Sequence, residues 1–192
     1  MGFVDDAPRM HFETLDEWRS WLAENHADSP GVFAISWRSV TGRPFIPYET
    51  MVEHALCFGW IDGRTQGLDD ERTMQWYTRR KRGSGWARPN KLRIERLSAD
   101  GLMMPAGIAM VEAAKADGSW TLLDSVELLE GPDELAAAFA SRPGAREFWD
   151  GLPRTPRRMM LEWVALAKTA STRTSRITQI ADRAAAGERA RG

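Results

Sequence analysis

The chain has 192 residues, of which 43% are hydrophobic and 28% are charged, and its formal net charge is −1. This composition predicts an ordinary globular protein of one domain, or one domain with a helical extension, with a real hydrophobic core. A net charge near zero argues against a protein that coats nucleic acid. The single cysteine excludes an internal disulfide and fits a reducing compartment.

The N-terminal sequence MGFVDDAPRMHFETL has neither the basic region nor the apolar region of a signal peptide. No run in the sequence approaches the roughly 18 apolar residues that a membrane-spanning helix needs. We therefore expect a cytoplasmic protein without membrane insertion.

Helical and strand patterns alternate in the first hundred residues. Thr14 and Glu17 have the spacing of a capping box at the start of a helix, and residues 31–38 alternate as a strand does. The expected elements are an extended lead-in over 1–12, a helix over 14–25, a strand over 31–38, a helix over 47–58, a hairpin of 60–65 with 73–78, and a helix over 89–97.

The remaining sequence is helical. Helices are expected over 105–117, with Ile108, Val111 and Ala114 as apolar positions, over 132–140, over 144–149, from Thr155-Pro156, and from Ser171 to Gly187. The fold class is therefore α+β: a small antiparallel sheet packed with helices, followed by a helical C-terminal part. The expected division is an α+β domain over 1–101 and a helical module over 102–192.

The stretch from Cys57 to Leu97 has the densest basic cluster, with eight Lys or Arg between residues 79 and 96 against the single acid Glu95. Gly83 and Gly85 let backbone N–H groups approach a ligand, and Ser84 adds a hydroxyl. The following helix start, near Asn90, favours anions. This loop predicts an anionic partner.

Nucleic acid is the lesser alternative partner for the basic loop 79–96. Trp76, Tyr77 and Trp86 interleave with its Arg and Lys residues, as in surfaces on which bases stack. The overall charge near zero speaks against this interpretation.

His54 and Cys57 stand three residues apart on one expected helix, where an imidazole can lower the pKa of a thiol. Cys57 lies in the apolar run ALCFGWI, however, where a cysteine is usually a small buried hydrophobic residue. We favour the structural role, with a Cys57 nucleophile as the alternative. Two such residues do not make a zinc site, so no metal and no cofactor is expected.

Asp62, in the segment WIDG, lies among aromatic residues and therefore needs a partner. Arg64, Arg79 or Arg80 could supply one across the hairpin, and an Asx turn with Gly63 is a further possibility. A general base is the catalytic alternative for this carboxylate.

Several segments resemble one known family. They are TLDEWRSWLAENH, GVFAISWR, ALCFGWIDG, the run Gln75–Thr78 with Arg80, Ser84 and Trp86, then Asn90, Lys91, Arg93 and Leu97, and the segments PAGIAMVEAAKADGSW, FWDGLP and RRMMLEWVALAKTASTRTSRI. On these segments the chain resembles the YdeI/OmpD-associated (bacteriocin-protection) family along nearly its full length. The resemblance implies a small α+β protein with a role in protection against bacteriocins or antimicrobial peptides.

The leading hypothesis is a non-catalytic stress or protection protein that binds a small anionic or aromatic molecule, or a protein partner. An enzyme that uses Asp62 or Cys57 is the first alternative and nucleic-acid binding is the second. Tryptophans would form apolar walls, arginines and a serine would hold an anion, Asp62 would position an arginine, and an asparagine would contribute from a helix start. The expected ligand-binding residues are Trp60, Asp62, Arg64, Arg80, Ser84, Trp86 and Asn90.

Overall fold

The computed structural model describes residues 7–191, which form two compact units. Within these residues, the first unit comprises 7–83 and 89–117, and the second comprises 84–88 and 118–191. The first unit combines a four-stranded sheet with helices and the second is helical, which confirms the α+β class.

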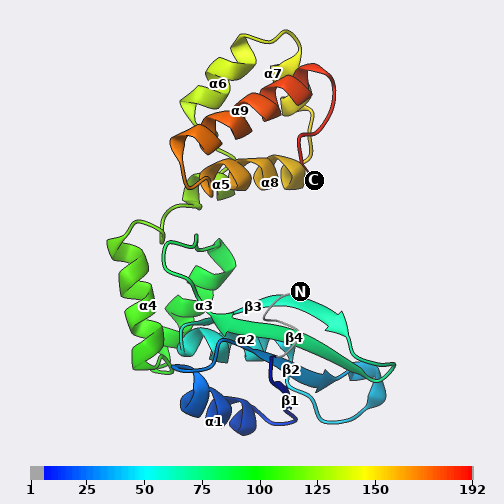
Figure 1. Ribbon diagram of the computed structural model, residues 1–192, viewed down its shortest axis with the longest axis vertical. Coiled ribbons are helices and arrows are strands. Elements are labelled where there is room, and N and C mark those ends of the chain that lie inside the picture. Colours follow the sequence, from blue (N-terminus) through cyan, green and yellow to red (C-terminus); the bar gives the residue numbers. More distant parts are fainter. Residues whose placement is uncertain (1–6, 192) are drawn as a thin grey trace. The chain divides into compact units, whose positions relative to one another are not determined.

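The first unit carries the sheet in the order β1-β2-β4-β3 (Figure 1). Its elements are β1 (Arg9–His11), α1 (Leu15–Asn25), β2 (Val32–Trp37), the 3-10 helix η1 (Ser39–Thr41), α2 (Tyr48–Cys57), β3 (Trp60–Gly67), β4 (Arg72–Arg79), α3 (Arg88–Ala99) and α4 (Pro105–Ala116). The expected hairpin is β3–β4, with longer strands than the sequence suggested.

The sheet also contains one parallel pair. Strand β1, within the expected extended lead-in, pairs in parallel with β2 so that Met10 lies opposite Ala34. The other pairs, β2–β4 and β3–β4, are antiparallel. The sheet is therefore mixed. The sequence did not reveal β1, because a strand of three residues is too short to show an alternating pattern.

The alternation expected for β2 is confirmed by its register. Val32 lies opposite Tyr77 and Ala34 lies opposite Gln75, so these four side chains share one face of the sheet. Trp18 of α1 contacts Tyr77, with ring centroids 5.0 Å apart. The face that carries Tyr77 is therefore the face that packs on the helices.

A β-bulge interrupts the hairpin. The register shifts between Asp62 and Thr65, where β3 places two residues opposite Trp76 alone. A Cβ atom at Gly63 would lie 2.8 Å from the Trp76 ring, so a glycine is needed for this close approach. Nε2 of Gln75 donates to the carbonyl of Gly63 at 2.7 Å and fixes the bulge.

Helix α4 buries two of its three expected apolar positions and exposes the third. Gly107, Val111 and Ala114 are its buried residues, whereas Ile108 is 49% exposed. Gly107 packs closely on the end of α2, and this contact sets the rotation of the helix about its axis.

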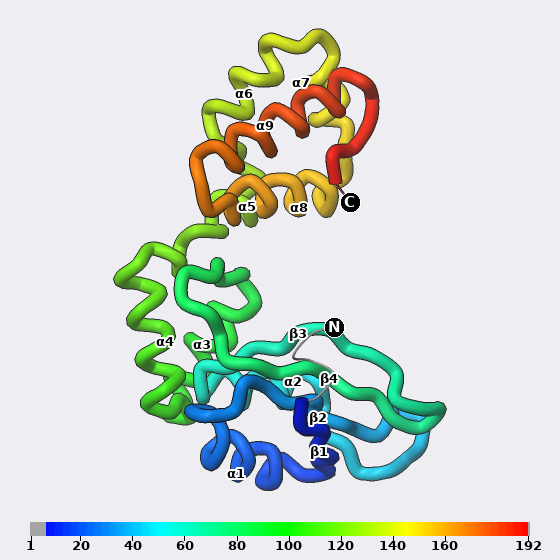
Figure 2. The backbone as a smooth tube through the Cα atoms, viewed as in Figure 1, coloured from blue at the N-terminus to red at the C-terminus, as the bar shows by residue number. Residues whose placement is uncertain are grey.

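The second unit is built from five helices around one core, and α9 packs against α6, α7 and α8 (Figure 2). Their bounds are α5 (Asp124–Glu127), α6 (Asp133–Ala140), α7 (Ala145–Asp150), α8 (Arg154–Ala165) and α9 (Ala170–Ala185). Helix α5 was not expected. The start of α8 was predicted too late, because its N-cap is Pro153. Helix α9 likewise begins before Ser171, since the Thr169 side chain accepts from the N–H of Thr172.

Candidate functional site

Trp60 lies in the core of the first unit. Its side chain is fully buried, and its indole N–H donates to the carbonyl of His26 at 3.0 Å. The ring also contacts Trp21 edge-on at 5.6 Å. Trp60 is therefore a packed core residue with a satisfied N–H rather than an exposed wall for a ligand.

Asp62 finds its hydrogen-bond partner in a residue that the sequence did not suggest. The hydroxyl of Tyr48, at the start of α2, donates to Oδ2 of Asp62 at 2.7 Å. Burial, followed by this hydrogen bond, raises the pKa of Tyr48 to about 12. Arg64, the nearest expected partner along the chain, is exposed.

Arg80 is 7% exposed, and its backbone N–H donates to the carbonyl of Gly59 at 2.9 Å. Burial lowers the pKa of Arg80 to about 10, and the negative charge of Asp62 opposes this shift. The guanidinium therefore stays protonated at neutral pH, as a cation in a largely desolvated position. The structure thus brings two of the expected residues, Asp62 and Arg80, into electrostatic interaction.

Asn90 takes part in a network between α3 and α2. Its Oδ1 accepts from Nη1 of Arg93 at 2.6 Å. The other side of the Arg93 guanidinium makes two hydrogen bonds of 2.7 Å to the carboxylate of Glu49, a bidentate geometry. The hydrogen bonding between Arg93 and Glu49 raises the pKa of Arg93 and lowers the pKa of Glu49.

The remaining two expected residues belong to the second unit. Trp86 is 2% exposed and its ring packs on Trp120, with centroids 5.0 Å apart. Between Ser84 and Trp86, a Cβ atom at Gly85 would lie 2.8 Å from the Leu123 side chain. This glycine therefore permits close packing within the unit.

Cys57 and His54 occupy buried positions in α2. Cys57 has no exposed surface, and burial raises the pKa of its thiol. A guanidinium N–H of Arg19 donates to Nδ1 of His54, so this nitrogen carries a lone pair. Burial, together with the charge of Arg19, lowers the pKa of His54. These surroundings are those of a structural pair, since a cysteine nucleophile needs access and a stabilised thiolate.

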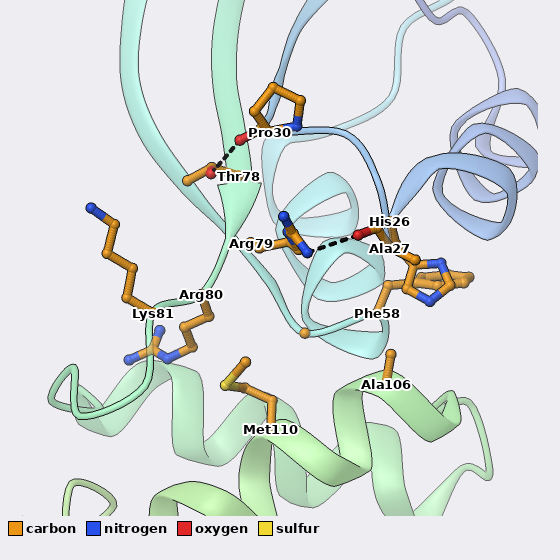
Figure 3. Close-up of a pocket in the computed structure, with 11 residues that line it drawn as sticks. His26, Ala27, Pro30, Phe58, Thr78, Arg79, Arg80, Lys81, Ala106 and Met110 are labelled. Atoms are coloured by element: carbon orange, nitrogen blue, oxygen red, sulfur yellow. Dashed lines mark hydrogen bonds between the residues drawn. The ribbon is translucent and has the colours of Figure 1, made fainter. Parts of the chain in front are cut away.

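The largest cavity described for the first unit lies between the end of β4 and helix α4, and we call it the basic cleft (Figure 3). Its volume is about 670 Å³. The lining residues are His26, Ala27, Pro30, Phe58, Gly59, Thr78, Arg79, Arg80, Lys81, Ala106 and Met110. Of the seven expected ligand-binding residues, this lining includes Arg80.

The two sides of the basic cleft differ in chemistry. Three consecutive cationic residues, Arg79, Arg80 and Lys81, line one side. Figure 3 shows Met110 projecting from α4 toward Arg80 and Ala106 projecting toward Phe58, so the α4 side of the cleft is apolar. The geometry suits a molecule that has both an anionic group and an apolar body.

Two hydrogen bonds fix the wall of the basic cleft. The Arg79 guanidinium donates to the carbonyl of Ala27 at 2.7 Å, and the hydroxyl of Thr78 donates to the carbonyl of Pro30 at 2.8 Å (Figure 3). The strand end is thus tied to the segment that follows α1.

Sequence reasoning missed the apolar side of the basic cleft. Ala106 and Met110 are four residues apart and so lie on one side of α4, a signal that the sequence contains. Their proximity to Arg80 depends on how α4 packs, which no spacing reveals.

Within residues 7–191, no three His, Cys, Asp or Glu side chains gather as metal ligands would. In the same range, no helix has the length and apolarity needed to cross a membrane.

Comparison with protein families divides the chain into two parts. Residues 129–187, in the second unit, match the family described as Bacteriocin-protection, YdeI or OmpD-Associated, which confirms the resemblance for this region. The resemblance was expected along nearly the whole chain, but residues 10–110 match a different family, described as Domain of unknown function (DUF8412). Searches of curated proteins and of solved structures found no match. Residues 129–187 are thus similar to the bacteriocin-protection family. Since residues 10–110 are more than half of the 192 residues, the chain belongs to the DUF8412 family.

Proposed function

We propose that this protein is a cytoplasmic, non-catalytic protein of the bacteriocin-protection type, and that its first unit binds a small anionic molecule with an apolar body. The match of residues 129–187 supports the protection role. The observation that carries the ligand proposal is the basic cleft, in which a cationic side faces an apolar side.

The cationic side favours an anionic group for two reasons. Lys81 is exposed and adds a positive charge beside Arg80, which is 7% exposed. A charge that is largely removed from water interacts more strongly with an opposite charge, because the local dielectric constant is lower. The anionic group of the ligand therefore belongs on this side.

The apolar side favours a ligand with a hydrophobic body. Met110 and Ala106 are partly buried and Phe58 is 4% exposed, so a ligand that covers them removes apolar surface from water. The cleft volume of about 670 Å³ lies within the range of roughly 300–1,000 Å³ that is typical of small-molecule sites. This size favours a small molecule over a protein partner.

Nucleic-acid binding through residues 79–96 has less support. The Arg79 guanidinium bonds to a backbone carbonyl, and Arg80 is buried. Arg93 and Arg96 form ion pairs with Glu49 and Glu53. These basic residues are thus engaged or buried within the chain, which leaves fewer charges for phosphates.

The proposal is tested with octanoate, which has a carboxylate and an apolar tail, against the uncharged octanol. We expect octanoate to bind more tightly in isothermal titration calorimetry. Lys81→Glu should weaken octanoate about fivefold, equivalent to roughly 1 kcal/mol for an exposed ion pair. Arg82→Glu is the matched control, because it makes the same charge change at an exposed neighbour that does not line the cleft. Its effect should be smaller.

A second variant tests the apolar side. Met110→Glu places a carboxylate against the ligand body and should abolish octanoate binding while the helical circular dichroism signal stays unchanged. Equal affinity for octanoate and octanol, or equal losses in Lys81→Glu and Arg82→Glu, would refute the anion site.

The protection role is tested by bacteriocin challenge of cells that lack the protein. Met110→Glu should fail to restore the survival that the unaltered chain restores.

A further inference from the structure

A second cavity in the first unit lies on the face of the sheet that packs on the helices, and we call it the sheet pocket. Its volume is about 390 Å³. Trp37, Phe45 and Tyr48 provide aromatic walls, and Gln75 and Tyr77 of β4 line it from the sheet. None of these residues lines the basic cleft, so the sheet pocket is a separate site.

Tyr77 has a buried polar group without a partner. Its side chain is fully buried, and its hydroxyl makes no hydrogen bond. Such a group destabilises a protein by about 1–3 kcal/mol, and most buried polar groups in folded proteins are paired. Burial, followed by the negative charge of Asp62, raises the pKa of Tyr77, so the hydroxyl remains protonated and can donate.

The polar part of the pocket is held in a fixed orientation. Nε2 of Gln75 donates to the carbonyl of Gly63 at 2.7 Å, and Oε1 accepts from the hydroxyl of Thr65. These two bonds determine which way the amide points. Gln75 is 8% exposed, so its position in the wall is set before any ligand enters.

Arg38 also lines the sheet pocket, but the surroundings of the Tyr77 hydroxyl disfavour an anionic group. Asp62 interacts electrostatically with both Tyr77 and Tyr48. An anionic group placed at the Tyr77 hydroxyl would be repelled by this carboxylate. The aromatic rings favour a flat, apolar molecule, since stacked or edge-on ring pairs add to the gain from burial.

We propose that the sheet pocket binds an uncharged aromatic molecule that carries a carbonyl group, and that this carbonyl accepts a hydrogen bond from the Tyr77 hydroxyl. The hydroxyl is screened from solvent, so the ligand must move a neighbour to reach it. In this proposal Tyr48 moves, because it lines the pocket, is 53% exposed and interacts electrostatically with Tyr77. The movement breaks its hydrogen bond to Asp62.

The experiment uses benzamide, which has an aromatic ring and a carbonyl, together with toluene and benzoate as probes. Binding to the full chain is followed by two-dimensional nitrogen–proton NMR, with the Trp37 indole N–H as a reporter in the pocket wall. We expect benzamide to bind more tightly than toluene or benzoate. Tyr77→Phe removes the donor and should weaken benzamide about tenfold, the loss typical of one hydrogen bond, while toluene affinity stays the same.

Tyr48→Phe is the control that distinguishes loss of the Tyr77 hydrogen bond from the loss of any hydroxyl in the pocket wall. It frees the Tyr48 ring from Asp62, so benzamide should bind at least as tightly as it does to the unaltered chain. Tyr77→Phe removes an unpaired group and should unfold at the same temperature or a higher one, so loss of folding does not obscure the result. The inference is wrong if the Trp37 signal does not shift, if benzoate binds best, or if both variants weaken benzamide equally.

Discussion

A Cβ atom at Gly107 of α4 would lie 2.2 Å from the carbonyl oxygen of Cys57 at the end of α2. The same oxygen accepts a hydrogen bond of 3.1 Å from the backbone N–H of Met104, the N-cap of α4. The two helices therefore meet backbone to backbone. This contact positions Ala106 and Met110, the apolar side of the basic cleft.

Gly107→Ala should destabilise the first unit by about 1–3 kcal/mol, the usual cost of overpacking. Alanine favours a helix by about 1 kcal/mol over glycine, but the clash with a backbone oxygen outweighs this gain because the oxygen cannot move alone. Urea unfolding measures the change. Ala109→Ser, on the exposed side of the same helix, is the control and should stay within about 0.5 kcal/mol. A Gly107→Ala chain as stable as the unaltered one would show that α4 is free to shift.

Cys57 should be chemically inert in the folded chain. Its side chain has no exposed surface and burial raises the pKa of its thiol, so little reactive thiolate is present at neutral pH. We expect Ellman's reagent to react with it at least about 100-fold more slowly in buffer than in 6 M guanidinium chloride, since access requires unfolding. Rapid labelling of the native chain would revive the nucleophile hypothesis.

Stability should fall as the pH drops below 6.5, because the pKa of His54 is lowered in the folded chain by burial and by Arg19. Above pH 6.5 the imidazole is neutral in both states, so it contributes no slope. Below this pH the unfolded chain binds the proton first, and the free energy of unfolding decreases by up to about 1.4 kcal/mol per pH unit.

Urea unfolding of the unaltered chain and His54→Gln at pH 7.0, 6.0 and 5.0 measures this dependence. Glutamine keeps an acceptor for Arg19 but does not titrate, so its stability should fall less between pH 7.0 and 5.0. Two parallel pH profiles would contradict the assignment to His54.

Local signals in the sequence located most of the helices and strands. Thr14 and Glu17 form the expected capping box, with both reciprocal hydrogen bonds present. Helix α2 ends before Gly59, whose φ of 74° is readily adopted by glycine. These predictions succeeded because each depends on residues that are neighbours in the chain.

The same local signals failed where a contact between distant segments decided the outcome. Strand β1 exists because β2 pairs with it, and the rotation of α4 that buries Gly107 and exposes Ile108 depends on the contact with Cys57. The helix and strand propensities of residues and the spacing of apolar residues do not reveal which distant segment a residue will contact.

The sequence by itself determined the α+β class, the hairpin, the concentration of positive charge after β4 and the resemblance of the C-terminal region to a protection family. Only the tertiary structure decided which of these charges face a cavity. It buried Trp60 and Trp86, joined Asp62 to Tyr48, and placed Arg80 in a cleft with Met110. The reason is physical: a residue type sets what a side chain can do, whereas its burial and partners depend on packing between segments far apart in the chain.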